Sequence, residues 1–159
     1  METEFIIQLK TDLVFDEGYR LDVYRCSADR RTVGVGHMLT PVDPEWSLQV
    51  GETITKERCE DILDYDIERT LDECEIVFKK YPYLPEPAQL VCANMMFNLG
   101  QTRLRAFKKF IAALEQDPPD FVKAAAEMKD SRWHQQLPNR SNRLISRMLK
   151  LADSTLGQE

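Results

Sequence analysis

The segment over residues 17–37 carries a carboxyl, a thiol and a hydroxyl side chain at short intervals. Eight residues separate Glu17 from Cys26, and five separate Cys26 from Thr32. Cleavage of a glycosidic bond needs an acid that protonates the leaving oxygen and a second group that activates water or attacks the sugar. Glu17 and Cys26 are candidates for these two groups if the fold places them on either side of one bond.

The pattern around these residues predicts the elements that position them. Apolar residues at helical spacing indicate a first helix over 3–14, which ends near Gly18. Alternating apolar and polar residues predict strands over 21–24 and 31–36, joined as a hairpin that brings the thiol and the hydroxyl together. Two glycines in the second strand leave bare backbone on one face, which suits the close approach of another group.

The rest of the chain is predicted to be mainly helical. After a loop over 41–53, Thr55 is a candidate N-cap for a long amphipathic helix of about 25 residues, which three prolines from residue 82 onward would end. Further predicted helices are 88–99 ended by Gly100, 104–114, a short helix from Asp117 or Pro119 to about 129, and 139–154. The order of helix, hairpin, long helix and helical bundle predicts an α+β fold.

Charge is unevenly distributed over the 159 residues, whose formal net charge is −6. Residues 1–88 carry 10 basic and 20 acidic side chains, whereas residues 89–159 carry 11 and 7. A uniformly basic nucleic-acid binder is therefore excluded. Basic residues repeat along one face of the last helix, where they predict either a solvated surface or attraction to an anionic wall polymer: Arg140, Arg143, Arg147 and Lys150.

The four cysteines lie at least fifteen positions apart, so no metal or redox motif with two close cysteines exists. We expect free thiols, as in a reducing cytosol, and no metal site, because only two histidines are present. No apolar run is long enough to span a membrane, so stable membrane insertion is not expected. The acidic start of the chain does not have the pattern of a secretory signal.

Several blocks of the sequence resemble the phage-type lysozymes, also called endolysins or glycoside hydrolase family 24. The family motif, Glu-x8-Asp/Cys-x5-Thr, is matched by Glu17, Cys26 and Thr32, and the sequence Val-Gly-Val-Gly-His follows. Residues 94–100 resemble the central helix of the family, and residues 131–140 resemble its segment with Ser-Arg-Trp and Pro-Asn-Arg. The resemblance covers nearly the whole chain.

The resemblance implies a single lysozyme-like domain with two lobes. A small β-hairpin lobe, joined by a long helix to a mainly helical lobe, is the family architecture. The implied boundaries are about 15–55 for the β lobe, about 55–80 for the connecting helix and about 81–159 for the helical lobe, with helix 3–14 packed on the latter. The substrate would lie between the lobes.

The resemblance also implies roles for individual residues, without a cofactor. Glu17 would be the general acid. Cys26 would act on the water molecule at the opposite face of the sugar, and Thr32 would help to hold that water. The supporting and substrate-contacting residues would be Arg140 paired with Glu17, His37 paired with Asp66, and Met38 and Phe97 against the substrate. Read without the family, His37 is a structural histidine, and Phe97 belongs to the core.

Cys26 stands where many relatives have Asp. A free thiol has a pKa near 8.5, so it is mostly protonated at neutral pH unless its surroundings lower that value. Arg25 and Arg30 are close in sequence and are candidates for this effect. A thiolate that activates water would invert the sugar configuration, whereas a thiolate that attacks the sugar would retain it.

The function implied is a muramidase that cleaves the β-1,4 bond between N-acetylmuramic acid and N-acetylglucosamine in bacterial peptidoglycan. It would be a monomer that accumulates in the host cytoplasm, acts on the periplasmic wall once a holin opens the membrane, and so causes cytolysis at the end of bacteriophage infection. The alternative is a degenerate lysozyme fold that binds wall glycan or another partner without hydrolysis. A nucleic-acid binder that uses the basic last helix is a weaker option, since it lacks a recognised motif.

Overall fold

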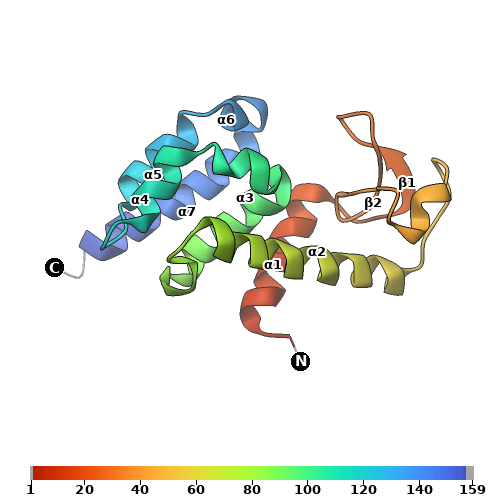
Figure 1. Ribbon diagram of the computed structural model, residues 1–159, viewed down its shortest axis with the longest axis horizontal. Coiled ribbons are helices and arrows are strands. Elements are labelled where there is room, and N and C mark those ends of the chain that lie inside the picture. Colours follow the sequence, from red (N-terminus) through yellow and green to blue (C-terminus); the bar gives the residue numbers. More distant parts are fainter. Residues whose placement is uncertain (1, 157–159) are drawn as a thin grey trace. The chain divides into compact units, whose positions relative to one another are not determined.

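The computed structural model describes residues 2–156, and the chain divides into two compact units, Met1–Arg69 and Thr70–Glu159. The first unit contains a small antiparallel sheet beside helical elements, and the described part of the second is helical (Figure 1). Helix α2, Lys56–Val77, crosses the boundary along the chain. The segregation of sheet and helices confirms the predicted α+β class.

Helix α1, Glu4–Glu17, begins and ends with cap residues. The Thr3 side chain accepts a hydrogen bond from a first-turn amide. At the other end, Gly18 has a φ of 84°, and its amide donates to the Val14 carbonyl at 2.9 Å. Glycine adopts positive φ without the steric cost of a Cβ atom. The predicted stop at Gly18 is therefore confirmed, and Glu17 is the last residue of the helix.

The sheet contains antiparallel strands in the order β1, β2, β3. Their bounds are Arg20–Arg25, Arg31–Gly34 and His37–Met38. The hairpin of β1 and β2 confirms the prediction, although the second strand ends at Gly34 instead of residue 36 (Figure 1). The two-residue β3 was not predicted, because so short a strand has no detectable alternation.

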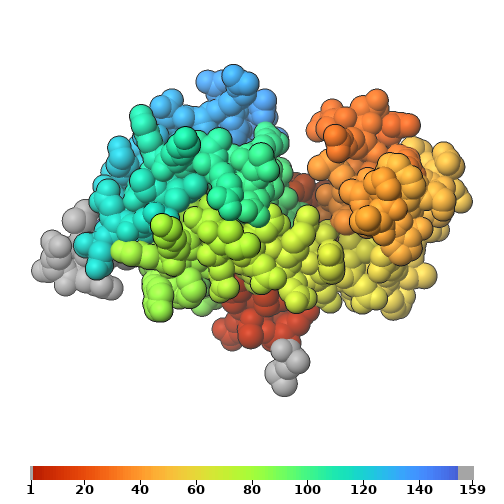
Figure 2. Space-filling view, in the orientation of Figure 1, coloured from red at the N-terminus to blue at the C-terminus, as the bar shows by residue number. Residues whose placement is uncertain are grey.

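A small apolar cluster lies in this first unit. Its buried members are Val23, Val33 and Leu39, with Leu48 and Ile54 packed against them. Between β3 and α2, the segment that was predicted as loop contains the 3-10 helix η1, Pro44–Ser47. In Figure 2 the orange atoms of this region and the yellow atoms at the start of α2 form one continuous surface. The hairpin that brings Cys26 and Thr32 together thus belongs to a sheet with its own apolar core.

Helix α2 begins as the sequence predicts. The Thr55 hydroxyl accepts a hydrogen bond from the Arg58 amide at 3.0 Å, which confirms the N-cap. The helix has 22 residues and ends at Val77, before the first proline. Pro85 is the N-cap residue of the next helix, so this proline precedes a helix start and does not terminate α2.

The second unit contains helical elements packed around a buried central helix. Their bounds are η2 Tyr81–Tyr83, α3 Glu86–Arg105, α4 Lys108–Glu115, α5 Phe121–Lys129, α6 Arg132–Gln136 and α7 Pro138–Leu156. Most residues of α3 between Ala88 and Leu99 are buried, as predicted for a core helix. Gly100 has non-helical backbone angles, φ 79° and ψ 164°, so it interrupts α3 where a stop was predicted.

Two predictions for the second unit are wrong. The single helix over 104–114 is interrupted, because the amides of Ala106 and Phe107 donate to carbonyls three residues back and form a tight turn before α4. The short helix α5 starts neither at Asp117 nor at Pro119. Asp120 is its N-cap, since its carboxylate accepts from the amide of Lys123 at 3.0 Å.

All four cysteines lie within the described residues and are free thiols, as predicted. Cys59, Cys74 and Cys92 are buried, and only Cys26 is partly exposed. Burial raises the pKa of each of the three buried thiols. Cys26 is therefore the thiol available for chemistry. Among the described residues, no helix is long and apolar enough to cross a membrane.

Candidate functional site

The carboxyl group of Glu17 lies directly against the backbone of Gly36. A Cβ atom at Gly36 would be 2.9 Å from both Cδ and Oε1 of Glu17, which is too close for any side chain. Gly36 also has a φ of 62°. The neighbouring Gly34 approaches the Sγ atom of Cys59 in the same way, at 3.3 Å from its missing Cβ. These contacts confirm that the two glycines admit the close approach of other groups.

Cys26 directly follows β1, at the start of the hairpin turn. Its amide donates to the Arg30 carbonyl at 3.0 Å, which closes the turn. Thr32 lies on β2 and is only 2% exposed. The hydroxyl of Thr32 donates to the Arg30 carbonyl at 2.9 Å and also interacts with the thiol of Cys26. The hairpin thus brings Cys26 and Thr32 together, as the motif spacing requires.

Hydrogen bonds lower the pKa of the Cys26 thiol from its ordinary value. Partial burial acts in the opposite direction, but the Thr32 hydroxyl and backbone amides of the turn outweigh it. A contribution of the Arg25 and Arg30 side chains is not among the largest of these effects and stays a prediction. The Arg25 guanidinium donates to the Asp29 carbonyl at 3.1 Å, within the turn. A lowered pKa increases the thiolate fraction at neutral pH.

Tyr24 connects the surroundings of Glu17 and Cys26. Burial raises the pKa of Tyr24, and the negative charges of Glu17 and of the Cys26 thiolate raise it further. Tyr24 is also the register partner of Thr32 across β1 and β2. Tyr24 therefore pairs with one of the residues predicted to be catalytic, and its pKa responds to the charges of the other two.

His37 lies between two carboxylates. Its Nδ1 atom is 2.6 Å from Oδ2 of Asp66 on α2, and its Nε2 atom is 3.1 Å from Oδ1 of Asp43. The predicted contact with Asp66 is thus present, whereas the sequence did not indicate Asp43. Burial lowers the pKa of His37, but the two carboxylates outweigh it and raise the pKa overall. The His37 ring links β3, the following loop and α2.

Met38 follows His37 on β3 and is 44% exposed. Its backbone pairs with Thr32, so its position along the sheet is adjacent to the motif. The exposed thioether leaves an apolar surface for a ligand, and the predicted contact of Met38 with substrate stays a prediction. The first unit therefore assembles six of the eight predicted site residues: Glu17, Cys26, Thr32, His37, Met38 and Asp66.

Arg140 and Phe97 belong to the second unit. Arg140 is 6% exposed, so it is not the surface cation that its place in a basic run suggests. Its Nε atom donates to the Asn94 side chain at 2.9 Å. Phe97 is half-buried on α3, between Asn94 and Asn98. The predicted pairing of Arg140 with Glu17 would join the two units and stays a prediction.

Asn94 and Asn98 are structural residues that the sequence reasoning did not single out. Asn94 is fully buried and accepts from Arg140, while Oδ1 of Asn98 accepts from the indole of Trp133 at 2.8 Å. The sequence did contain a signal for them, since two amide side chains lie one helical turn apart in a mostly apolar stretch of α3. Buried polar groups need hydrogen-bond partners, so this pair predicts polar contacts with another element.

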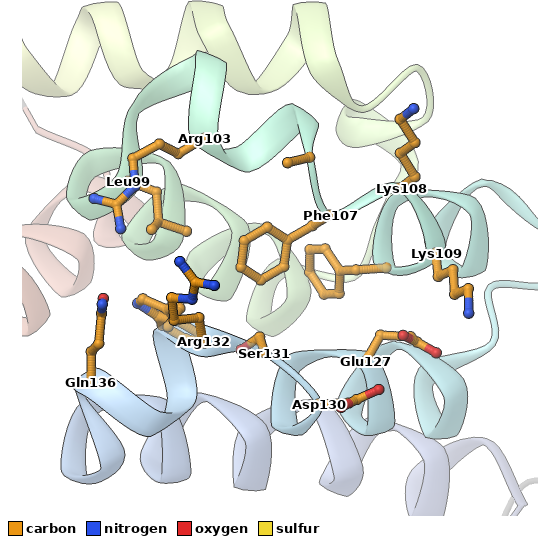
Figure 3. A pocket seen from close by; sticks show the side chains of 13 residues that line it. Leu99, Arg103, Phe107, Lys108, Lys109, Glu127, Asp130, Ser131, Arg132 and Gln136 are labelled. Atoms are coloured by element: carbon orange, nitrogen blue, oxygen red, sulfur yellow. The ribbon is translucent and has the colours of Figure 1, made fainter.

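The second unit also contains a pocket with a volume of about 560 Å³ (Figure 3). Phe107, Phe110 and Trp133 form part of its wall, with edge-to-face ring contacts at 6.4 Å between centroids. Charged side chains surround this apolar surface: Arg103, Lys108, Lys109, Glu127, Asp130 and Arg132. Such a composition is typical of a ligand pocket, and sequence reasoning did not find it.

Metal-binding side chains are not grouped in the described part of the chain. No set of three or more His, Cys, Asp or Glu residues there is arranged to hold a metal ion. The polar groups described above suit proton transfer and binding of a neutral or anionic glycan.

The chain is similar in sequence to several known proteins. The family model described as phage lysozyme matches residues 15–149. "Probable T4-type lysozyme 2" of Dictyostelium discoideum is 28% identical over 160 residues, covering 89% of this chain and 93% of the relative. "Peptidoglycan hydrolase gp36" of Pseudomonas phage phiKMV is 27% identical and covers 90% of this chain but 15% of that relative. An "Endolysin" from Acyrthosiphon pisum secondary endosymbiont phage 1 is 31% identical over 70% of this chain and 68% of its own.

The chain belongs to the phage lysozyme family, because the family model covers most of its length. This membership confirms the resemblance found in the sequence and supports a lysozyme-like glycoside hydrolase function. Peptidoglycan is the substrate that the family implies.

Proposed function

We propose that this protein is a muramidase, which hydrolyses the β-1,4 bond between N-acetylmuramic acid and N-acetylglucosamine in peptidoglycan. The observation that carries this proposal is the contact of the Thr32 hydroxyl with the Cys26 thiol, on a hairpin that also places the Glu17 carboxyl against Gly36. A proton donor and a nucleophilic or basic group are then both carried by the first unit. These are the two functions that glycosidic cleavage needs.

In the proposed reaction, Glu17 donates a proton to the leaving glycosidic oxygen while the carbon–oxygen bond breaks. The Cys26 thiolate takes a proton from a water molecule, which attacks the sugar from the opposite face. Thr32 helps to hold that water. The configuration at the sugar carbon inverts in this route. Direct attack by the Cys26 sulfur would instead form a thioglycosyl intermediate and retain the configuration.

Supporting and substrate-contacting residues from both units complete the proposed site. Arg140 pairs with Glu17, while Met38 and Phe97 contact the sugar rings. His37 and Asp66 act by positioning β3 on α2, where their contact of 2.6 Å lies. The two lobes and their connecting helix are proposed to form one lysozyme-like domain.

The proposed biological role is lysis of the bacterial host at the end of phage infection. The enzyme accumulates as a monomer in the cytoplasm and reaches the periplasmic wall after a holin permeabilises the membrane. Names among the relatives support this role, since an endolysin and a phage peptidoglycan hydrolase are similar to this chain. The proposal requires no signal peptide.

Substitutions at the two reacting groups test the proposal. Glu17→Gln removes the labile proton, so we expect release of reducing sugar from purified peptidoglycan to fall by at least about 100-fold. Cys26→Ala should also be inactive, whereas Cys26→Asp should restore hydrolysis because a carboxylate can take the proton from water. Circular dichroism and thermal unfolding serve as the controls for folding.

The outcomes separate the enzyme from the alternative. Substantial hydrolysis by Glu17→Gln would contradict the role of Glu17. If the wild-type protein binds peptidoglycan in a pull-down assay but releases no reducing sugar, the fold is a glycan-binding module. Analysis of the product anomer by NMR decides between inversion and retention.

A further inference from the structure

The first unit also contains a pocket, which lies beside the hairpin and has a volume of about 590 Å³. Its wall includes Arg20, Tyr24 and Arg25 from β1, Arg31 from β2, and the segment 49–51. That segment is held along β1 by the Gly51 amide, which donates to the Val23 carbonyl at 2.8 Å. None of the predicted catalytic residues lines this pocket. Because three arginines line it, we call it the arginine pocket.

Positive charge exceeds negative charge in the arginine pocket. Three guanidinium groups line it, and Asp22 is the carboxylate among the lining residues. Asp22 is bound in a two-point contact by Arg20, with distances of 3.1 and 2.6 Å. Arg25 is 3.7 Å from Asp29, whose side chain is 86% exposed and therefore screened by water. The excess is notable because residues 1–88 carry twice as many acidic as basic side chains.

Arg31 is fixed in place without a carboxylate partner among its described contacts. Its Nη1 atom donates to the backbone carbonyls of Trp46 and Leu48, and its guanidinium carbon lies 4.6 Å from the centre of the Trp46 ring. Carbonyl groups orient the guanidinium but leave its full positive charge for a ligand. Because the side chain is already ordered, an anion would bind with little further loss of entropy.

Tyr24 places this pocket next to the proposed catalytic groups. The Arg20 guanidinium lies 4.2 Å from the centre of the Tyr24 ring, on the wall of the pocket. Tyr24 is the register partner of Thr32, and Arg25, which also lines the pocket, directly precedes Cys26. An anion in the pocket would therefore be close to the bond being cleaved, as expected for a group of the substrate itself.

We propose that the arginine pocket binds carboxylates of the peptide attached to N-acetylmuramic acid, and so selects glycan strands that carry peptides. This inference rests on the proposed function, which supplies the glycan. Guanidinium groups recognise carboxylates through paired hydrogen bonds, and muramic acid carries its peptide on the sugar next to the cleaved bond. The pocket then determines specificity and does not take part in bond cleavage.

Kinetics on two matched substrates test the specificity. Soluble glycan strands are compared before and after an amidase removes their peptides. The double variant R20Q/R25Q should raise KM for the peptide-bearing strands by roughly tenfold, the loss expected for two partly exposed charge contacts. Its kcat should stay near that of the wild type, and its KM for stripped strands should not change.

Arg30→Gln is the matched control, because Arg30 is exposed on the same hairpin but does not line the pocket. It removes one positive charge and should leave both KM values unchanged. An equal loss for peptide-bearing and stripped strands, or no loss for either, would overturn the proposal.

A binding measurement separates this inference from the proposed function. NMR titration with the tripeptide L-alanyl-γ-D-glutamyl-diaminopimelate should shift the amide signals of Gln49 and Gly51 in the wild type, and the shifts should be lost in R20Q/R25Q. Inorganic phosphate at the same concentration should shift them much less; equal shifts would show a general anion site and overturn the proposal. Hydrolysis without tripeptide binding would disprove the pocket assignment alone, whereas binding without hydrolysis would disprove the proposed reaction.

Discussion

Cys26 differs from an aspartate at the same place because its charge depends on its neighbours. The Thr32 hydroxyl and backbone amides of the turn lower the pKa of the thiol against the opposing effect of burial. The Thr32 hydroxyl donates to the Arg30 carbonyl at 2.9 Å and also interacts with the Cys26 thiol. A residue proposed to hold water thus also sets the ionisation of the proposed base.

Replacing Thr32 with valine tests this dependence. Thr32→Val removes the hydroxyl and keeps the shape, so the pKa of Cys26 should rise. The pH dependence of alkylation by iodoacetamide measures it, because the other three cysteines are buried in the folded protein. We expect the midpoint of the alkylation rate to move to higher pH.

Thr32→Ser is the matched control, since it retains the hydroxyl and should keep the midpoint close to that of the wild type. An unchanged midpoint in Thr32→Val would show that backbone amides alone determine the ionisation of Cys26.

At the scale of elements, His37 fastens β3 and the following loop to α2. Its ring contacts Asp66 and Asp43, and Asp66 also lies 3.4 Å from Arg69 on α2. The side chains of His37, Asp43 and Asp66 are at most 15% exposed, so their charges are poorly screened by solvent. The pKa of His37 is raised in the folded protein, which means that folding favours its protonated form.

The contribution of His37 to stability should depend on pH. It is fully present below the unfolded pKa of about 6.5 and is lost as the pH rises through the higher pKa of the folded state. His37→Gln should therefore lower the free energy of unfolding by about 3 kcal/mol at pH 6 and by less at higher pH. Urea unfolding at a series of pH values measures both effects.

Glu68→Gln serves as the control for this measurement, because Glu68 is an exposed carboxylate on the same helix. That variant should keep the decline in stability above pH 6.5. If His37→Gln keeps it as well, another group causes the decline.

At the scale of the whole molecule, α2 joins two units of different charge along the chain. The proposed site uses Glu17 from the first unit and Arg140 from the second, so it requires a defined connection between them. Asp72 is exposed on α2, three positions beyond Arg69, where the first unit ends. Because Asp72 is exposed, a substitution there can interrupt the helix backbone without removing a buried side chain.

Asp72→Pro should interrupt α2 and lower the free energy of unfolding by about 3 kcal/mol, because proline removes a backbone hydrogen bond and clashes with the preceding turn. We expect hydrolysis of peptidoglycan to be largely lost even below the unfolding temperature. Asp72→Ala should retain stability and hydrolysis. Full activity of folded Asp72→Pro would show that the site does not depend on a continuous helix.

Much of the fold was predictable because local patterns determine it. The hairpin, the stop at Gly18, the cap at Thr55 and the break at Gly100 each depend on residues a few positions apart. The errors arose where equally good local signals competed. Four acidic or proline residues, 117–120, directly precede α5, and the backbone geometry around Asp120 selected this residue as the N-cap.

The candidate site was predictable to a smaller extent. Spacing alone placed Cys26 and Thr32 in contact, since a hairpin must fold one strand end onto the other. Spacing did not indicate Asp43 beside His37 or the buried contact of Arg140 with Asn94. The last pair is separated by 46 positions, and no periodic pattern extends across such a distance.

The sequence by itself determined the helix, hairpin and helix order, the motif of Glu17, Cys26 and Thr32, and the resemblance to the lysozyme family. Only the tertiary structure decided which charges are buried, which groups lower the pKa of Cys26, and where the two pockets lie. The physical reason is range. Helices, turns and caps form through contacts between near neighbours in the chain, whereas burial and electrostatic interaction depend on every group that packing brings close in space.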